Sequence, residues 1–243
     1  EQARVHADNN AIAMRFIMEH YQRAGNLSRT NPDEAEAALK RLQDFQTNEG
    51  ADVKIPAFVS QQIARLEKSI ADTRRRDALV GSDAAYPENV VAWVNGEELT
   101  PQDLKGKVVL LDFFAVWCGP CVATFPHLRD WHDQYHNDGL EIIGLSNYQE
   151  YGWDEETKRP VSKRGEIAPE EEHEAMKQFA VHHELRHPIG FTKDRSLSEH
   201  YVVSGIPHVV VIDRQGKVRL FKIGSGDANA HAVEEAIKEC LAE

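Results

Sequence analysis

The sequence predicts an α/β fold, with a mixed β-sheet flanked by helices, preceded by a small all-α domain. Three observations support this prediction. Apolar, β-branched runs typical of buried strands occur at 108–114 and 140–145. Segments with helical spacing of apolar residues separate these runs. Residues 1–80 carry helical patterns alone, which indicates about three amphipathic helices.

The three stripes in the first domain define three expected helices. The first ends at the Gly25-Asn26 pair, and Asn31 before Pro32 predicts an N-cap followed by a first-position proline. This second helix is expected to close at 47–50, and a third to run from near Pro56 to about Arg76. The stripe positions are Ile12, Phe16, Ile17, Tyr21, Ala35, Ala38, Leu39, Leu42, Phe45, Val59, Ile63, Leu66 and Ile70. Such stripes usually form the core of a small bundle, and a dimerisation arm or substrate-recruitment module is the alternative.

A linker is predicted at 81–89, which separates the helical domain, 1–80, from an α/β domain, 90–243. Val90–Val94 is expected as a short strand, followed by a two-residue hairpin turn at Asn95-Gly96. A helical turn is expected at 100–105. Further helices are expected at 118–136, 169–185 and 230–241.

The order of these elements also predicts how the strands pair. A right-handed crossover through the helix at 118–136 places the strands at 108–114 and 140–145 parallel. The turn at 214–217 joins the strand within 204–213 to 218–223 as an antiparallel hairpin. The sheet is therefore expected to be mixed.

The strongest chemical signal is a Cys-x-x-Cys, Cys118 to Cys121, directly after the buried strand. At a helix N-terminus, free backbone N–H groups and the helix dipole stabilise the thiolate, the form that attacks disulfides. Cys118 would lie at the exposed start of the helix as the nucleophile, and Cys121 one turn inside as its resolving partner. A zinc site would need a second ligand pair, and the remaining cysteine, Cys240, has no local partner. Haem attachment would need a His at position 122, where the chain has Val122. A structural disulfide across so short a loop would stabilise little.

Residues 147–168 form a long polar insertion with three aromatic residues near its start, Tyr148, Tyr151 and Trp153. Loops of this length in compact domains are usually functional or mobile. Two interpretations remain open. The insertion could supply part of a substrate groove with Tyr151 and Trp153 as anchors, or it could pack its aromatics against its own domain.

Residues on both sides of the cysteines resemble the thioredoxin-like superfamily. Trp117-Cys118-Gly119-Pro120-Cys121 is similar to its active-site signature, and the segment 204–213, with Ile206-Pro207, is similar to its cis-proline strand. Asp112 and Pro126 fall where the family carries a buried acid and a helix kink. The lead-in 96–107 resembles the extracytoplasmic TlpA/ResA-like branch. The resemblance covers about 86–243 and leaves out the first 85 residues.

This resemblance implies a thiol-disulfide oxidoreductase with Cys118, Cys121 and Asp112 as catalytic residues. The substrate-binding residues it implies are Trp117, Gly119, Pro120, Ile206 and Pro207. It implies no cofactor, partners that are proteins bearing thiols or disulfides, and a further redox partner that recycles the cysteine pair. It also implies an extracytoplasmic location, periplasmic or anchored facing outward. ResA-like members often carry an acid where this chain has Thr124, so their substrate does not transfer. The Gly-Pro dipeptide favours net reduction.

Composition limits the remaining possibilities. Hydrophobic residues make up 41% and charged residues 28%, ordinary for a soluble globular protein, and no apolar run approaches the roughly 20 residues that span a bilayer. The net charge of −12 lies almost entirely in 86–243, which argues against nucleic acid as a partner. Twelve histidines, including His132 and His136 on one helix face, leave a copper-handling chaperone as the alternative function. A disulfide-forming oxidase on the same fold is a second alternative. A peroxidase function is disfavoured, because this chain lacks the motif expected around Cys118.

Overall fold

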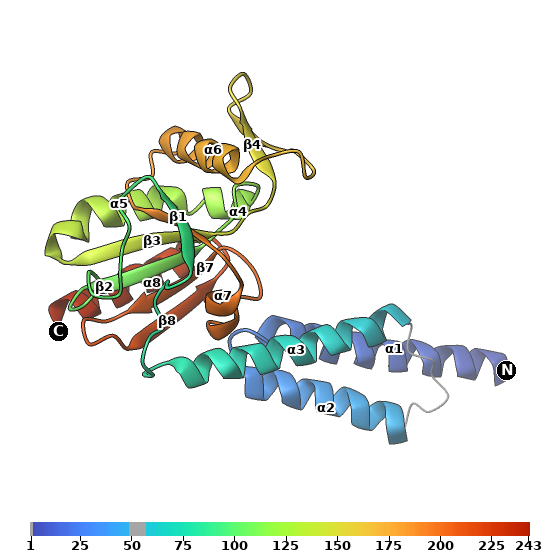
Figure 1. The fold of residues 1–243 in the computed structure, drawn as a ribbon. Helices are drawn as coiled ribbons and strands as arrows, with labels where there is room; N and C mark the ends of the chain where they lie inside the picture. Colours follow the sequence, from blue (N-terminus) through green and yellow to red (C-terminus); the bar gives the residue numbers. More distant parts are fainter. Residues whose placement is uncertain (1, 49–56) are drawn as a thin grey trace. The chain divides into compact units, whose positions relative to one another are not determined.

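The structure, a computed structural model, describes residues 2–48 and 57–243, with side chains at 11–45 and 59–243. The fold divides into two compact units, one ending at Asp77 and one from Ala78 to Glu243 (Figure 1). The sequence-based linker, 81–89, lies a few residues beyond this division. The predicted helix end at Gly50 and helix start at Pro56 lie outside the described residues.

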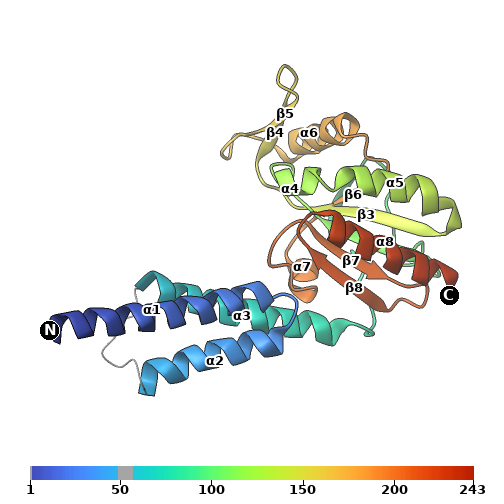
Figure 2. The same cartoon turned by 180° about the vertical axis from the view of Figure 1, so that it is seen from behind.

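The first unit consists of three helices, α1 (Gln2–Leu27), α2 (Pro32–Asn48) and α3 (Ala57–Leu79), which lie side by side in both views (Figure 2). The predicted cap of α2 is confirmed, because Asn31 Oδ1 accepts a hydrogen bond from the Glu34 N–H at 3.2 Å. The shared core consists of Ile17, Ala24, Ala35, Ala38, Leu39, Leu42, Val59 and Ile70. Two details differ from the prediction: Gly25 lies inside α1, and Ile12 points to solvent.

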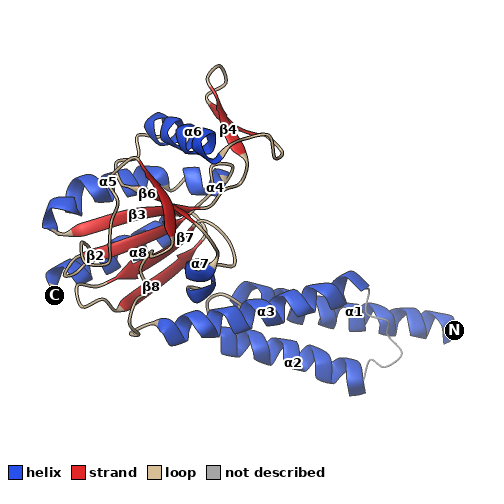
Figure 3. Ribbon diagram, viewed as in Figure 1, coloured by secondary structure: helices blue, strands red, loops and turns tan. Residues whose placement is uncertain are grey.

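The second unit contains a six-stranded mixed sheet with the strand order β1-β6-β3-β2-β7-β8 (Figure 3). The pairs β2/β3 and β3/β6 are parallel, and the other neighbours are antiparallel. The parallel β2/β3 pair and the antiparallel β7/β8 hairpin are those that the connections predict. The strands are β1 (Val90–Val94), β2 (Val108–Phe113), β3 (Leu140–Ser146), β6 (Ile189–Thr192), β7 (His208–Ile212) and β8 (Val218–Ile223). The helices are α4 (Gly119–Val122), α5 (Phe125–Tyr135), α6 (Pro169–His182), α7 (Ser196–His200) and α8 (Asp227–Ala242), with a 3₁₀ turn at His136–Asp138.

The side chains of β2 point alternately to the two faces of the sheet, and each face carries its own apolar core. Val108 and Leu110 point to a cluster shared with α5, α6 and α8, through side chains such as Phe125, Phe179 and Ile237. The odd-numbered residues of β2 point to the opposite cluster, which contains Leu104, Leu197 and Tyr201. Because every residue of β2 is buried, this strand is the interior of the unit.

Of two local predictions after β1, one is wrong and one is confirmed. Asn95 has a positive φ of 58°, as a tight turn requires, but the strand before it does not form a hairpin with the next one. Instead β1 pairs with β6, almost 100 residues later, and the Asn95 side chain donates hydrogen bonds to the carbonyls of Leu185 and His187. The helical turn expected at 100–105 is confirmed as consecutive hydrogen-bonded turns at 101–106, and Asp103 accepts from the Thr100 N–H and hydroxyl.

Gly96 is close-packed against the segment that leads into β6, and this packing can be tested. An added Cβ would lie 2.7 Å from Pro188 Cβ and 3.0 Å from Pro188 Cα. We expect Gly96→Ala to lower the free energy of unfolding by about 1–3 kcal/mol, measured by urea denaturation, because a rigid ring and backbone must move. Gly25→Ala is the control. Its Cβ would meet only a Leu66 methyl group at 3.9 Å, so stability should hold or rise by up to about 1 kcal/mol. Equal stability of Gly96→Ala and wild type would contradict the contact.

Candidate active site

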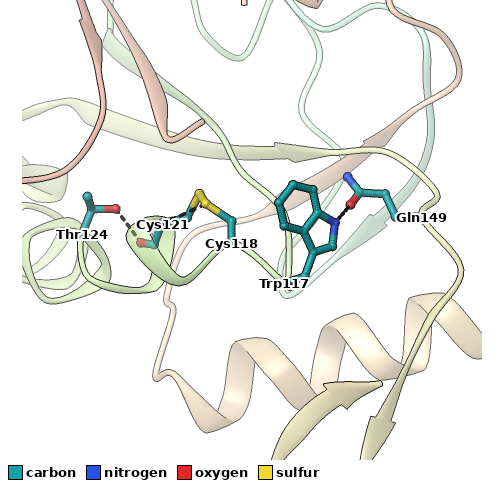
Figure 4. Close-up of a disulfide and its surroundings, with 5 residues drawn as sticks. All are labelled: Trp117, Cys118, Cys121, Thr124 and Gln149. Atoms are coloured by element: carbon teal, nitrogen blue, oxygen red, sulfur yellow. Dashed lines mark hydrogen bonds between the residues drawn. A yellow bond between two sulfur atoms is a disulfide. The ribbon is translucent and has the colours of Figure 1, made fainter. Parts of the chain in front are cut away.

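The cysteine pair lies where the buried strand β2 ends and the short helix α4 begins. Cys118 is the N-cap of α4, and its Sγ accepts a hydrogen bond from the Cys121 N–H at 3.2 Å. Gly119-Pro120 forms the first turn, where a proline costs no backbone hydrogen bond. The two sulfur atoms form a disulfide (Figure 4). The local structure therefore directs a backbone N–H toward the sulfur of Cys118, as thiolate stabilisation requires.

Both cysteines belong to the buried cluster on the α5 face of the sheet. Cys118 is only 4% exposed and Cys121 is fully buried, so the prediction of an exposed Cys118 is wrong for this oxidised state. The neighbouring Trp117, Gly119 and Pro120 are the exposed residues of the motif.

The active-site helix is interrupted, whereas the sequence pattern predicted one helix over 118–136. α4 ends at Val122 and α5 starts at Phe125. Pro126 is the cause, because it has no N–H to donate to the carbonyl of Val122 one turn earlier. Thr124 compensates in part, since its hydroxyl donates to the Cys121 carbonyl at 2.7 Å (Figure 4).

Asp112 is fully buried in the middle of the sheet, on the same face of β2 as Leu110, toward the cysteine cluster. Its pairing partners are Gly144 on β3 and Val209 on β7, and neither brings a polar side chain. Among the described residues, neither carboxyl oxygen has a hydrogen-bond partner. Burial therefore raises the pKa of Asp112 from 3.8 to about 7.

The segment before β7 brings the predicted substrate-facing backbone to the same region. The Ile206-Pro207 peptide bond is cis, and Gly224 N–H donates to the Pro207 carbonyl at 2.8 Å. Ile206 is half-buried and packs against the cluster that holds Cys118 and Cys121. A cleft of about 250 Å³ lies beside this segment, and its lining includes Gly205, Ile206 and Gln149.

The insertion forms a small two-stranded sheet, β4 (Tyr151–Asp154) and β5 (Arg159–Ser162), rather than an irregular loop. Trp153 packs edge-on against Phe179 of α6, with ring centroids 6.2 Å apart. Tyr148 stacks on Phe191, and its hydroxyl lies 2.7 Å from Nε2 of His173. Of the two open interpretations, packing against its own domain is thus observed for Trp153 and Tyr148.

Two residues that sequence reasoning missed lie at the base of this insertion. Gln149 Oε1 accepts a hydrogen bond from the indole N–H of Trp117 (Figure 4). The buried carboxylate of Glu172, in the first turn of α6, accepts from the N–H groups of Gln149 and Glu150 at 2.7 and 3.1 Å. Only the high polarity of 147–150 hinted at these contacts, because the partners are more than 20 residues apart.

The histidines show no metal site. No group of three or more His, Cys, Asp and Glu residues that could hold an ion occurs among the described residues. His132 and His136 stack on each other, with centroids 4.7 Å apart. His187 is buried, which lowers its pKa to about 3, so its ring is neutral at physiological pH. Cys240 is buried and packs in the main cluster.

The fold and the cysteine pair define a thiol-disulfide oxidoreductase domain of the thioredoxin-like class. The comparison with protein families then assigns it: the chain belongs to the AhpC/TSA family, whose model matches residues 83–221. No helix in 2–48 or 57–243 is both long and apolar enough to cross a membrane.

Individual relatives agree with this class. Thiol-disulfide oxidoreductase ResA of Bacillus cereus is 29% identical over 139 residues, 57% of this chain and 66% of that protein. ResA of Bacillus subtilis is 32% identical over 138 residues, 57% of this chain and 64% of that protein. The chain thus spans slightly less than two thirds of these relatives. A thiol-disulfide isomerase from Corynebacterium glutamicum shares the fold, with a TM-score of 0.52 and 24% identity over 67% of this chain and 98% of that one.

The buried carboxyl makes stability depend on pH. Its pKa of about 7 in the folded state exceeds its ordinary 3.8, so between these values the folded protein binds the proton more tightly than the unfolded chain. The contribution of protonated Asp112 to the free energy of unfolding is therefore greatest below about pH 4. As the pH rises toward 7, this contribution falls by about 1.4 kcal/mol per pH unit.

We expect Asp112→Asn to remove this loss. The measurement is urea unfolding of the disulfide form at pH 5 and pH 8, with the difference between variant and wild type compared at the two values. Asp130→Asn, at an exposed position on α5, is the control and should keep the wild-type pH dependence. A difference that is the same at both pH values would show that Asp112 does not titrate in this range.

Proposed function

We propose that the chain acts as a reductase of protein disulfides, with Cys118 as nucleophile and Cys121 as resolving thiol. One observation carries the proposal: Cys118 caps α4, receives the Cys121 N–H on its sulfur, and is close enough to Cys121 to form a disulfide. The same N–H would donate to the Cys118 thiolate in the reduced enzyme. A charge-assisted hydrogen bond of this kind lowers the pKa of a thiol and raises its thiolate fraction.

The reaction then proceeds in two exchanges. The Cys118 thiolate attacks one sulfur of the substrate disulfide, which breaks that bond, forms a mixed disulfide and releases the other substrate sulfur as a thiolate. The Cys121 thiolate next attacks the sulfur of Cys118. The mixed disulfide breaks, the Cys118–Cys121 disulfide forms, and the second substrate sulfur leaves as a thiolate. Two electrons have passed from the enzyme dithiol to the substrate.

Asp112 would serve as the base for the second exchange. Cys121 is buried and must lose its proton before it attacks, and Asp112 lies on the same face of the sheet with no competing hydrogen-bond partner among the described residues. A carboxylate with a pKa near 7 is a suitable acceptor at neutral pH, directly or through a water molecule. The apolar surroundings that make the ionised Asp112 carboxylate costly to bury also make it a stronger base.

The substrate would bind across the exposed part of the motif and the segment before Pro207. Trp117, Gly119 and Pro120 offer an exposed surface beside Cys118, and the Ile206 backbone could pair with an extended substrate strand. The natural substrates would be proteins that bear thiols or disulfides, and a second redox partner would reduce the enzyme after each turnover. The likeness of 96–107 to the TlpA/ResA-like branch supports a site of action outside the cytoplasm.

The reduction potential distinguishes this proposal from a disulfide-forming oxidase. We expect a value toward the thioredoxin end of the known range, roughly −270 mV, when the Cys118/Cys121 pair is equilibrated with glutathione. Cys118→Ser should lose reductase activity, and Cys121→Ser should accumulate the mixed disulfide. A potential near −120 mV would identify an oxidase instead. Stoichiometric copper on the reduced, active-site-intact protein, without reductase activity, would favour the chaperone alternative.

The role of Asp112 as a base gives a separate kinetic prediction. Asp112→Asn should slow resolution of the mixed disulfide by about 10²-fold at pH 7.5, because proton removal from Cys121 loses its acceptor. In the wild type the rate should rise with pH through about 7 as the carboxylate ionises. The measurement is stopped-flow release of the substrate thiol, with Asp130→Asn as control. A wild-type rate in Asp112→Asn would remove Asp112 from the mechanism.

A further inference from the structure

The exposed tryptophan of the active site has a partner from outside the thioredoxin-like core. Trp117 is 52% exposed, one of the few large apolar side chains on the surface of the described residues. Its indole N–H donates to the side-chain oxygen of Gln149, which comes from the segment after β3 (Figure 4). This contact orients a ring that packing alone leaves half in solvent.

Gln149 is itself held at its backbone. The Glu172 carboxylate is 7% exposed, and its two oxygens accept separately from the N–H groups of Gln149 and Glu150. Glu150 adopts a positive φ of 62°, an unusual conformation for a side chain of this type, and its carbonyl accepts from Lys163 N–H at 2.8 Å. The base of the insertion is thus held to α6 by Glu172 and closed across its two strands by the Lys163–Glu150 bond.

A half-exposed ring that is already held in one orientation loses less conformational entropy when a substrate binds to it than a freely rotating ring does. Ordering an interface side chain on binding opposes association, and a ring ordered beforehand avoids this entropic cost. Gln149 also lines a cleft together with Gly205 and Ile206. The side chain that holds the indole is therefore also part of the cleft beside the segment before β7.

We propose that Gln149 is a positioning residue that fixes Trp117 for binding of protein substrates, and that Glu172 fixes Gln149 in turn. This inference rests on the proposed function and deepens it: the insertion, through Gln149, determines affinity for extended protein substrates and takes no part in sulfur exchange. The effect should appear in KM for a protein and be absent for a small disulfide that does not reach the indole.

The test compares Gln149→Leu with wild type on insulin and on dithiobis(nitrobenzoate). With insulin we expect KM to rise about fivefold with kcat unchanged, the size of effect that loss of one hydrogen bond produces. The rate with the small disulfide and the reduction potential should not change. Gln149→Glu, which retains the acceptor oxygen, should restore slow hydrogen exchange of the Trp117 indole N–H, measured by NMR. Gln134→Leu, at an exposed position on α5, is the matched control.

A double-mutant cycle tests whether Gln149 acts through Trp117, and it uses more than one variant. In a Trp117→Phe background the donor is absent, so Gln149→Leu should add no further change in KM. Glu172→Gln should raise KM for insulin in the same direction, while Glu171→Gln, an exposed position in the same helical turn, should not. Additive effects of Trp117→Phe and Gln149→Leu on KM, or an equal loss of rate on both substrates, would overturn the positioning role. A wild type that reduces neither substrate would instead refute the proposed function.

Discussion

The complete burial of β2 is the constraint on which the rest of this domain depends. Six consecutive residues without solvent contact require a neighbour on each edge and cover on each face, and β3, β7 and the two apolar clusters supply them. After β2 ends at Phe113, the chain leaves the buried interior and starts α4 at Gly119. The cysteine pair is therefore fixed by a strand that cannot shift in register without exposing one of its faces.

The same burial determines the electrostatics of the site. Asp112 and Cys121 are both fully buried, so a charge on either is poorly solvated, and a proton passed from the Cys121 thiol to the Asp112 carboxylate keeps a single charge in the interior. Cys118 differs because a backbone N–H is directed at its sulfur. Two sulfur atoms three residues apart thus experience opposite environments. This asymmetry supports the proposed roles of Cys118 in attack and Cys121 in resolution.

The sequence predicted those parts of the structure that depend on local pattern. The β-branched run at 108–114, the parallel crossover to 140–145 and the Asn31 cap follow from periodicity and capping chemistry, and the structure confirms them. Asn95-Gly96 carried a genuine turn signal, but the partner of β1 was decided by sheet order, which no local signal encodes. Gln149 and Glu172 were missed for the same reason. Their contact joins residues that only the tertiary fold brings together.

The small sheet β4–β5 has a consequence for how this protein can diversify. A two-stranded hairpin is marginally stable alone, and this one gains its support near its base, from Glu172 at Gln149 and Glu150 and from the Trp153 ring on α6. Residues of its tip, such as Glu156 and Thr157, are exposed and belong to neither apolar cluster. Substitutions at the tip would therefore leave the contacts at the base, and the buried cysteine pair, in place.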